Sequence, residues 1–334
     1  MNMPLDMNKV APANPSAPLG LAAPAAVFAL LACAPFLVGN YYLAAAILVA
    51  IYLLPALGLN IIFGYTGMLS FAQGAFFGIG AYTSAILATR LGLPFWLTIS
   101  LAVPAAAVVA WIVAIPALKL SKLSFVMVTL GLVLLAHAVA GNWIWLTQGH
   151  SGITGLPPPY LGFGEDALPL RSLRAYYYVA LFVSIIGLAA CYAIVASPAG
   201  RCLRAVRDDE LLAAAYGIPV NRYKTIAFAL SAGFAAVGGA LEVHYITLAS
   251  PSVFEIYYTN AFLVIVLAGG RGSFWAVPVA TVAFVFTTQL FGMNPQVQQL
   301  LMGMVLVFLV FFMPNGFGPA LVKLGNRLRR RAAT

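Results

Sequence analysis

The chain has 334 residues, of which 63% are hydrophobic and 7% charged, and its formal net charge is +9. These proportions exclude an ordinary water-soluble domain, in which about a quarter of the residues are charged. Uncharged apolar runs near the length of a membrane-crossing helix recur along the chain, and the period-two alternation of a membrane barrel is absent. The composition therefore predicts an all-α protein, a polytopic helical membrane protein.

The N-terminal residues 1–19 hold four prolines among small residues. They lack the charged, then apolar, then cleavage-site layout of a secretory signal. We expect them to form a flexible cytoplasmic tail.

About ten apolar runs follow, and each is expected to form one transmembrane helix. Together they make up a transmembrane domain over residues 20–314, and residues 315–334, with the string LGNRLRRR, form a basic cytoplasmic tail. The ten expected spans are residues 20–39, 41–63, 74–90, 94–118, 123–146, 175–197, 225–247, 258–272, 273–292 and 298–314.

The distribution of basic residues predicts the orientation of these spans. With both termini in the cytoplasm, only Arg90, Arg171 and Arg174 fall outside, so 14 of the 17 Lys and Arg residues lie inside, as the positive-inside rule requires. Basic residues at the cytoplasmic face meet anionic lipid head groups. The net charge therefore needs no nucleic acid to explain it.

Residues 58–82, around the end of the second span, are rich in glycine. Gly74 and Gly78 have the small-xxx-small spacing that lets helices approach closely, and such packing explains many membrane glycines. Polar residues alternate with the glycines, and an interrupted helix exposes backbone groups that can face a cavity. We hypothesise that this segment borders a solute path near its cytoplasmic half, with Asn60, Gly64, Gly67, Ser70 and Gln73 as candidate lining residues.

The fifth span and the loop after it contain further polar candidates. His137 lies near the middle of the fifth span, and ionisable groups at membrane depth are expensive and often functional; it is added to the candidate path. Glu242 and His244, near the outer end of the seventh span, are expected to be structural. Residues 147–174, rich in proline and charge, predict a periplasmic loop.

Residues 198–224 form an island of charge between two apolar spans. Ser197 suits a helix N-cap with Pro198 at the first helical position, and Gly217 suits the left-handed residue after the end. The pattern predicts one helix of about 17 residues at the membrane surface, whose apolar contacts would be Leu203, Val206, Leu211 and Leu212. A solvated connector between two spans would have the same pattern.

The string LAGGRGSF at 267–274 weakly repeats GYTGMLSF at 64–71. Both follow spans that enter the cytoplasmic side, which would suit two repeated halves. A glycine-rich turn between two helices is the preferred interpretation of the second string, because the match is short.

No catalytic or metal-binding constellation is present in the sequence. A phosphate-binding loop ending in Lys-Ser or Lys-Thr, a pair of His on one helix face, and a nucleophile with its base and orienting acid are all missing. Energy for uphill transport would therefore come from an ion gradient or from a partner. Ion-coupled carriers need ionisable groups at membrane depth, and the predicted spans contain few.

Several strings together resemble the branched-chain amino acid ABC transporter permeases. They are GLNIIFGYTGMLSFAQGAFFGIGAYTSAIL at 58–87, VTLGL at 128–132, TQGHSGITGLP at 147–157, SPSVF, LAGGRGSF, and GRCLRAVRDDELLAAAYGIPVNRYKTIAFALSAGFAAVGGAL from Gly200 onward. About 250 residues are covered in the expected order. The length of the periplasmic-side loop resembles the M-type subunit rather than the H-type.

The resemblance implies a membrane-spanning subunit that is not itself an enzyme, in the cell inner membrane. It implies a second permease of the same family or a second copy, two cytoplasmic ATPases that bind ATP and Mg, and a periplasmic solute-binding protein; no cofactor is expected on this chain. The helix from Gly200 to Tyr216 would dock on an ATPase, and replacing Arg207 and Asp208 with Ala would uncouple transport from ATP hydrolysis. The implied coupling residues are Gly200, Arg201, Leu203, Arg204, Val206, Arg207, Asp208, Asp209, Glu210 and Gly217, with Leu203 and Val206 as the apolar anchor.

The solute and the energy source stay open at this point. Branched-chain amino acids are the solutes that the resemblance implies, and urea or short amides are alternatives. A self-sufficient ion-coupled carrier or channel is the alternative of another class, and it would depend on His137 or Glu242.

Overall fold

The structure is a computed structural model that describes residues 35, 39–157, 160–161, 168–169, 172–290, 300 and 303–308. The chain divides into two units, Met1–Gly39 and Asn40–Thr334. Only residues 35 and 39 of the first unit are described, so the expected N-terminal tail and the rest of the first span lie outside the described residues, as does the C-terminal tail.

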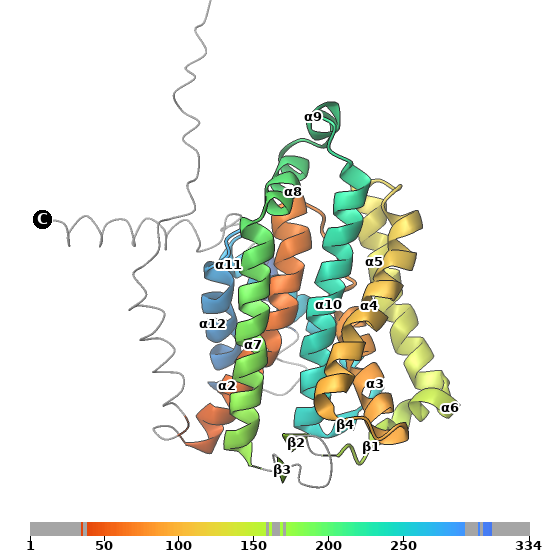
Figure 1. The fold of residues 1–334 in the computed structure, drawn as a ribbon, viewed down its shortest axis with the longest axis vertical. Coiled ribbons are helices and arrows are strands. Elements are labelled where there is room, and N and C mark those ends of the chain that lie inside the picture. The colour runs from red at the N-terminus through yellow and green to blue at the C-terminus, as the bar shows by residue number, and fades with distance from the viewer. Residues whose placement is uncertain are drawn as a thin grey trace, which may run out of the picture. The chain divides into compact units, whose positions relative to one another are not determined.

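The second unit is a bundle of helices (Figure 1). Its long helices are α2 (Asn40–Leu59), α3 (Gln73–Arg90), α4 (Phe95–Ala117), α5 (Lys122–Asn142), α7 (Leu173–Ala196), α10 (Val220–Ile246), α11 (Ile256–Gly269) and α12 (Ala276–Leu290). The short ones are the π-helical η2 (Asn60–Gly64), α6 (Ile144–Thr147), η3 (Gly149–Ser151), α8 (Pro198–Asp208), α9 (Glu210–Ala215) and η4 (Pro251–Phe254).

The described residues also include four β-strands of two residues each. β1 (Ile153–Thr154) pairs antiparallel with β4 (Leu248–Ala249), and β2 (Tyr160–Leu161) pairs antiparallel with β3 (Leu168–Pro169). They join loops and do not form a layer of the fold.

Five described helices are long and apolar enough to cross a membrane, and α11 and α12 are shorter apolar helices. The five are Asn40–Gly64, Phe95–Ala117, Lys122–Asn142, Leu173–Ala196 and Val220–Ile246. The sequence prediction of an all-α, multi-pass membrane protein is therefore confirmed. Eight of the ten expected spans coincide with a helix within a few residues; of residues 298–314, the structure describes only 300 and 303–308, as helix.

Helix α10 lies at the centre of the bundle, where it packs against α2, α3 and α4. Glycines allow this close approach. A Cβ atom at Gly80 would collide with the backbone of Ala236 on α10, and one at Gly239 would collide with the carbonyl of Phe77 on α3. Packing of this kind was expected for the glycines of residues 58–82, and it explains Gly78, which faces the ring of Phe254.

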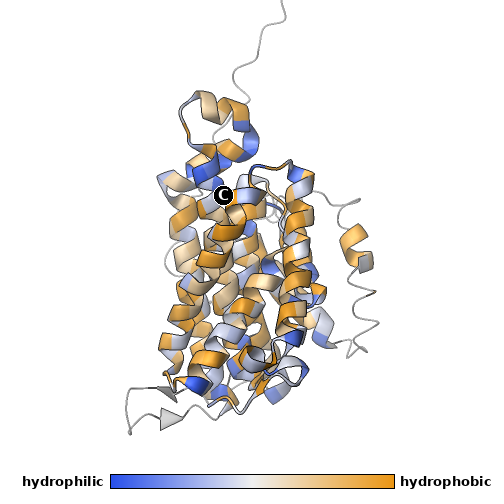
Figure 2. Cartoon of the chain, turned by 90° about the vertical axis from the view of Figure 1, so that its right-hand side faces the viewer, coloured by the Kyte–Doolittle hydropathy of each residue, from blue (hydrophilic) through white to orange (hydrophobic). Residues whose placement is uncertain are grey.

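The two ends of the bundle differ in chemistry, as Figure 2 shows by the gathering of hydrophilic residues at α8 and at the turns. We call the end with α8 and α9 the charged end, and the end with β1 and β4 the strand end (Figure 1). The described basic residues of the charged end are Lys119, Lys122, Arg201, Arg204, Arg207, Arg222, Lys224 and Arg271. Arg90 and Arg174 are the described basic residues of the strand end, where Trp143 and Trp145 are exposed.

Candidate functional site

Helix α8 begins as the sequence predicts. The hydroxyl of Ser197 accepts a hydrogen bond from the backbone N–H of Gly200 at 3.3 Å, and Pro198 follows at the first helical position. Gly200 is buried against the end of α7, where a Cβ atom would collide with the carbonyl of Val195. The turn between α7 and α8 therefore has little freedom to change its angle.

The predicted single helix of about 17 residues is wrong, because the chain breaks at Asp209. This residue is extended, with φ −155° and ψ 114°, and its Oδ1 accepts hydrogen bonds from the N–H groups of Leu211 at 2.9 Å and Leu212 at 3.0 Å. An Asp side chain that bonds the backbone ahead of it competes with a continuing helix and caps a new one. The new helix, α9, ends before Gly217, which has the expected positive φ of 81°.

The expected apolar anchor also needs correction. Leu203 and Val206 are 2% and 0% exposed, because they pack α8 onto the bundle, so they are not available to a partner. The exposed apolar side chains of this segment are Leu211 (85%), Leu212 (56%) and Tyr216 (80%). An apolar contact with another protein would come from α9 and not from α8.

Ion pairs attach the base of α9 to two long helices. Glu210 receives a 2.6 Å hydrogen bond from Nζ of Lys224 on α10 and lies 3.4 Å from Nζ of Lys122 on α5. Burial raises the pKa of the Glu210 carboxyl, but the Lys224 hydrogen bond and the charges of Lys224 and Lys122 outweigh it, so the pKa is lowered overall. Glu210 is therefore ionised at neutral pH and fixes α9 to the start of both helices.

The polar residues of α8 differ in their contacts. Arg201, Arg207 and Asp208 are exposed and Arg204 is partly exposed. Arg207 nevertheless contacts the bundle, because its Nη1 donates a 2.8 Å hydrogen bond to the backbone carbonyl of Gly64. Its Nε lies 3.3 Å from Oδ1 of Asp208. Arg207 thus joins the expected coupling segment to the expected path segment, 143 residues away in the sequence.

The two glycine turns that the sequence relates meet at this arginine. The backbone N–H of Gly272, in the turn between α11 and α12, donates a 3.0 Å hydrogen bond to Oδ1 of Asn60. A Cβ atom on Gly272 would collide with both the Gly64 carbonyl and the Arg207 guanidinium. The guanidinium of Arg271 lies 5.3 Å from the ring centre of Phe63. We call this contact of α8, η2 and residues 270–273 the arginine junction.

Asn60 and Gly64 belong to the arginine junction, and Gly67 lies beside it. Asn60 is fully buried, and it begins the π-helical turn η2, a distortion that often marks functional positions in helices. Gly67 has a φ of 73°, and a Cβ atom there would approach Cγ of Arg207 to 3.1 Å. The interruption that the sequence predicts for this helix is therefore present, beside the charged end.

Ser70 and Gln73 are buried and lie deeper in the bundle than Gly67. The Gln73 side-chain amide donates to the carbonyl of Pro55 at 2.7 Å and accepts from the hydroxyl of Ser231 at 2.9 Å. Thr129 on α5 and Thr259 on α11 bond the backbone between Ser70 and Gln73: Thr129 Oγ1 accepts from the N–H of Phe71, and Thr259 Oγ1 donates to its carbonyl. The irregular segment is thus held between α5 and α11.

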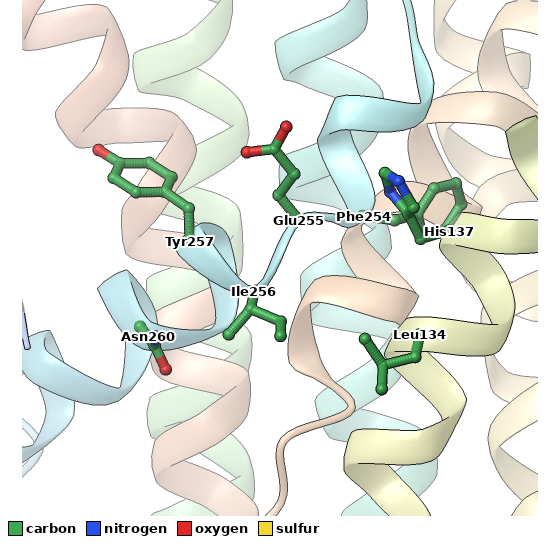
Figure 3. A pocket seen from close by; sticks show the side chains of 7 residues that line it. All are labelled: Leu134, His137, Phe254, Glu255, Ile256, Tyr257 and Asn260. Carbon is green, nitrogen blue, oxygen red and sulfur yellow. The ribbon is translucent and has the colours of Figure 1, made fainter. Parts of the chain in front are cut away.

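An open cavity of about 520 Å³ lies between α5 and α11, with His137 on its wall (Figure 3); Leu134, Glu255 and Ile256 on the same wall are exposed. The other five path candidates do not line it. Its lining residues are Leu134, His137, Phe254, Glu255, Ile256, Tyr257 and Asn260. Of these, the sequence indicated only His137, although Glu255, a carboxylate directly before an apolar run, was a signal that could have been used.

Within the described ranges, no group of three His, Cys, Asp or Glu residues could hold a metal ion. The geometry is that of a membrane-type helix bundle with an attached charged segment, and comparison with known proteins identifies its family.

The family described as "Branched-chain amino acid transport system / permease component" matches residues 41–310. The chain belongs to this family of permeases.

Individual relatives agree with this assignment. The permease is 30% identical to the high-affinity branched-chain amino acid transport system permease protein LivM of Escherichia coli (strain K12), over 85% of its own length and 72% of LivM. It is 26% identical to LivH of the same organism over 66% of its length and 75% of LivH, and 26% identical to BraD of Pseudomonas aeruginosa over 79% of its length and 90% of BraD. No solved structure matches the permease.

Proposed function

We propose that this permease is a membrane-spanning subunit of an ATP-binding-cassette importer that carries branched-chain or related amino acids across the inner membrane. In this proposal about ten spans place both termini in the cytoplasm, and the charged end faces the cytoplasm. Its partners are a second permease of the family or a second copy, two ATPases that supply ATP and Mg chemistry, and a periplasmic solute-binding protein. The names of LivM, LivH and BraD support the solute class.

The observation that carries the proposal is the construction of α9. Its exposed face presents Leu211, Leu212 and Tyr216 to the surroundings, while its base is fixed by Glu210 to Lys122 and Lys224. Exposed large apolar side chains on a charged segment mark a protein contact. A rigidly attached contact element can transmit a movement of its partner to α5 and α10.

Such an importer works by alternating access. Closing of the ATPases on ATP would move α8 and α9, and the arginine junction would pass this displacement to η2 and to the turn between α11 and α12. The bundle then changes between outward-open and inward-open states whose populations depend on nucleotide.

Purification of the tagged permease from its own membrane in mild detergent tests the proposal. ATP hydrolysis should co-purify with the parent chain and be lost when Leu211 and Leu212 are both replaced by Ser, because the apolar contact is removed. Leu91→Ser is the matched control, since Leu91 is 65% exposed at the strand end and should keep the ATPase. Equal loss in both variants, or retention in the double variant, contradicts the α9 contact.

One observation favours an ion-coupled carrier as a second candidate. The carboxylate of Glu242 is buried in α10, with one oxygen accepting a hydrogen bond from Tyr258 at 2.9 Å and the other without a hydrogen-bond partner among the described residues. A carrier would transport leucine in vesicles without ATP and would lose this activity in Glu242→Gln. ATP-dependent uptake that Glu242→Gln retains would exclude it.

A further inference from the structure

The cavity between α5 and α11 lies at membrane depth. His137 is 15 residues after Lys122 at the charged end, which corresponds to about 22 Å along α5 at ~1.5 Å per residue. It lies six residues before the exposed Trp143, or about 9 Å below the strand end. Helix α11 ends at Gly269, next to the arginine junction at the charged end, and has 14 residues. This is fewer than the ~20 needed to cross a bilayer. Glu255, just before the start of α11, is therefore also within the membrane region.

Three polar groups on the cavity wall have unused hydrogen-bonding capacity. In the described part of the chain, the Glu255 carboxylate has no hydrogen bond and no ion pair, and the Asn260 side-chain amide has no hydrogen bond. Nδ1 of His137 lies 3.1 Å from the carbonyl of Pro251. Because a carbonyl only accepts, Nδ1 carries a proton, and in the neutral tautomer Nε2 is left as an acceptor.

Polar and apolar side chains alternate on the wall, with Phe254 beside His137 (Figure 3). Glu255 lies between Tyr257 and His137 in Figure 3, with Leu134 and Ile256 below it and Asn260 farther along α11. Asn260 follows Ile256 by four residues, so both lie on one face of the helix. Leu134, Phe254 and Ile256 supply the apolar surface.

The Glu255 side chain is exposed, and an exposed carboxylate without a counter-charge at membrane depth is costly unless it faces a water-filled path. The counter-charge of Glu255 would be a cationic solute that passes through the permease. An inorganic cation such as Ca²⁺ needs six to eight oxygen ligands, and this cavity offers a single carboxylate beside mostly apolar side chains. An organic ammonium group with an attached aliphatic part fits the same surface, and the cavity is within the usual ~300–1,000 Å³ of small-molecule sites.

We propose that this cavity is a transient binding site for an aliphatic α-amino acid on its way through the permease; this inference rests on the proposed function. The solute ammonium group bonds the carboxylate of Glu255 and Nε2 of His137. Its carboxylate accepts a hydrogen bond from the side-chain amide of Asn260, and its aliphatic side chain lies on Leu134, Phe254 and Ile256.

The place of the cavity in the bundle suits a passage site. Thr129 and Thr259, which hold the irregular segment around Phe71, belong to the same two helices. Thr129 lies eight residues before His137, or about 12 Å closer to the charged end. A displacement at the arginine junction would therefore reach the floor of the cavity through the segment that precedes α3.

Protection of an introduced cysteine tests the site directly. In membrane vesicles carrying the full chain, with its native cysteines replaced by Ala, Leu134→Cys is labelled with a maleimide in the presence and absence of L-leucine. At leucine about twice its dissociation constant, labelling should slow about threefold by mass action. Glu255→Gln should abolish this protection, and Glu255→Asp should restore part of it. Ile256→Cys provides a second labelling position in case Leu134→Cys does not fold.

Two controls make the result specific. Glu242→Gln removes a neighbouring buried carboxylate that does not line the cavity, and it should leave leucine protection unchanged. The solute 4-methylpentanoate lacks the ammonium group and should protect neither version. The site is excluded if leucine protects Glu255→Gln as well as its parent, if leucine protects neither, or if 4-methylpentanoate protects as strongly as leucine.

Uptake of labelled leucine in the same vesicles separates this inference from the proposed function. Absence of ATP-driven uptake by the parent chain contradicts the importer. ATP-driven uptake that remains unchanged in Glu255→Gln contradicts only the cavity site.

Discussion

At the scale of single residues, the contacts of Arg207 connect α8 to the bundle and do not leave its guanidinium free to bind another protein. Its guanidinium donates a hydrogen bond to the backbone carbonyl of Gly64 at 2.8 Å. Because the acceptor is a main-chain atom, this hydrogen bond depends on the position of the η2 backbone. The surrounding glycines leave room for it, since any Cβ atom at Gly67 or Gly272 would approach the arginine. The arginine junction therefore needs glycine and arginine together.

Replacement of Arg207 tests this link. A hydrogen bond from a charged donor contributes about 1.5–3 kcal/mol, and the side chain is partly exposed, so Arg207→Ala should weaken the junction by about 1–2 kcal/mol. We expect ATP-driven leucine uptake to fall about tenfold, with membrane insertion and the co-purified ATPase retained. Uptake in vesicles and the amount of bound ATPase measure the two effects.

Arg201→Ala is the matched control for Arg207→Ala. Arg201 lies on the same helix and is exposed, so its replacement removes one charge without touching η2. Parent-like uptake in Arg207→Ala would contradict the link, and an equal loss in Arg201→Ala would assign the effect to the charge of α8 and not to the junction.

At the scale of elements, α8 and α9 are two units with different tasks. Buried Leu203 and Val206 fix α8 to the bundle, and exposed Leu211 and Leu212 make α9 available to a partner. The break between them depends on one side chain, because both described cap hydrogen bonds of α9 end at Oδ1 of Asp209. An element of six residues is too short to persist without such help.

Removal of the Asp209 cap should loosen α9 alone. Replacing an N-cap Asp by Ala costs about 1 kcal/mol, so in Asp209→Ala the amide hydrogens of residues 211–216 should exchange about fivefold faster. Hydrogen exchange followed by mass spectrometry measures this. Asp208→Ala, one residue earlier and outside the cap, should leave the exchange of α9 unchanged, and Asp209→Asn should retain much of the protection.

The ion pairs of Glu210 predict a dependence of α9 on pH. The pKa of Glu210 is lowered in the folded state, below its usual value of about 4.3. Its contribution to stability is therefore fully present above about pH 4.3 and is lost as the pH falls through the lower folded pKa. A dye on Leu211→Cys should show constant anisotropy from neutral pH to about pH 5 and increased motion in stronger acid.

Glu210→Gln is the control for that titration. The amide keeps the size of the side chain but cannot pair with Lys122 and Lys224, so the dye should be mobile at all pH values. An acid transition that persists in Glu210→Gln would come from another group.

Local patterns predicted the parts of the structure that depend on local chemistry. Apolar runs located the helices, and the Ser197 cap and Gly217 turn were found from residue type alone. The break at Asp209 was missed because an Asp is tolerated in a charged helix unless its side chain bonds forward. The burial of Leu203 and Val206, and the meeting of Arg207 with Gly64, depend on tertiary contacts; His137 and Pro251, which together set the ring orientation in the cavity, are 114 residues apart.

At the scale of the whole molecule, the described contacts form one continuous series between α9 and the cavity. Exposed α9 is joined to α5 and α10 through Glu210, α8 is joined to η2 through Arg207, and Phe71 is joined to α5 and α11 through two threonines. The cavity lies between α5 and α11. Two sites coupled through elements with two discrete arrangements should respond to each other's ligands.

The nucleotide state should therefore change access to the cavity. With Leu134→Cys in vesicles that contain the complete importer, the rate of maleimide labelling from outside should differ between the nucleotide-free state and a state trapped with ATP and vanadate. A ligand changes access only as far as it changes the populations of the two states. If the arginine junction transmits the movement, Arg207→Ala should reduce the difference between the two rates, while Arg201→Ala should preserve it. Equal labelling rates in both nucleotide states of the parent would show that the ATPases do not control access to the cavity. An undiminished difference in Arg207→Ala would mean that the movement reaches α5 and α11 through Glu210 and its two lysines instead.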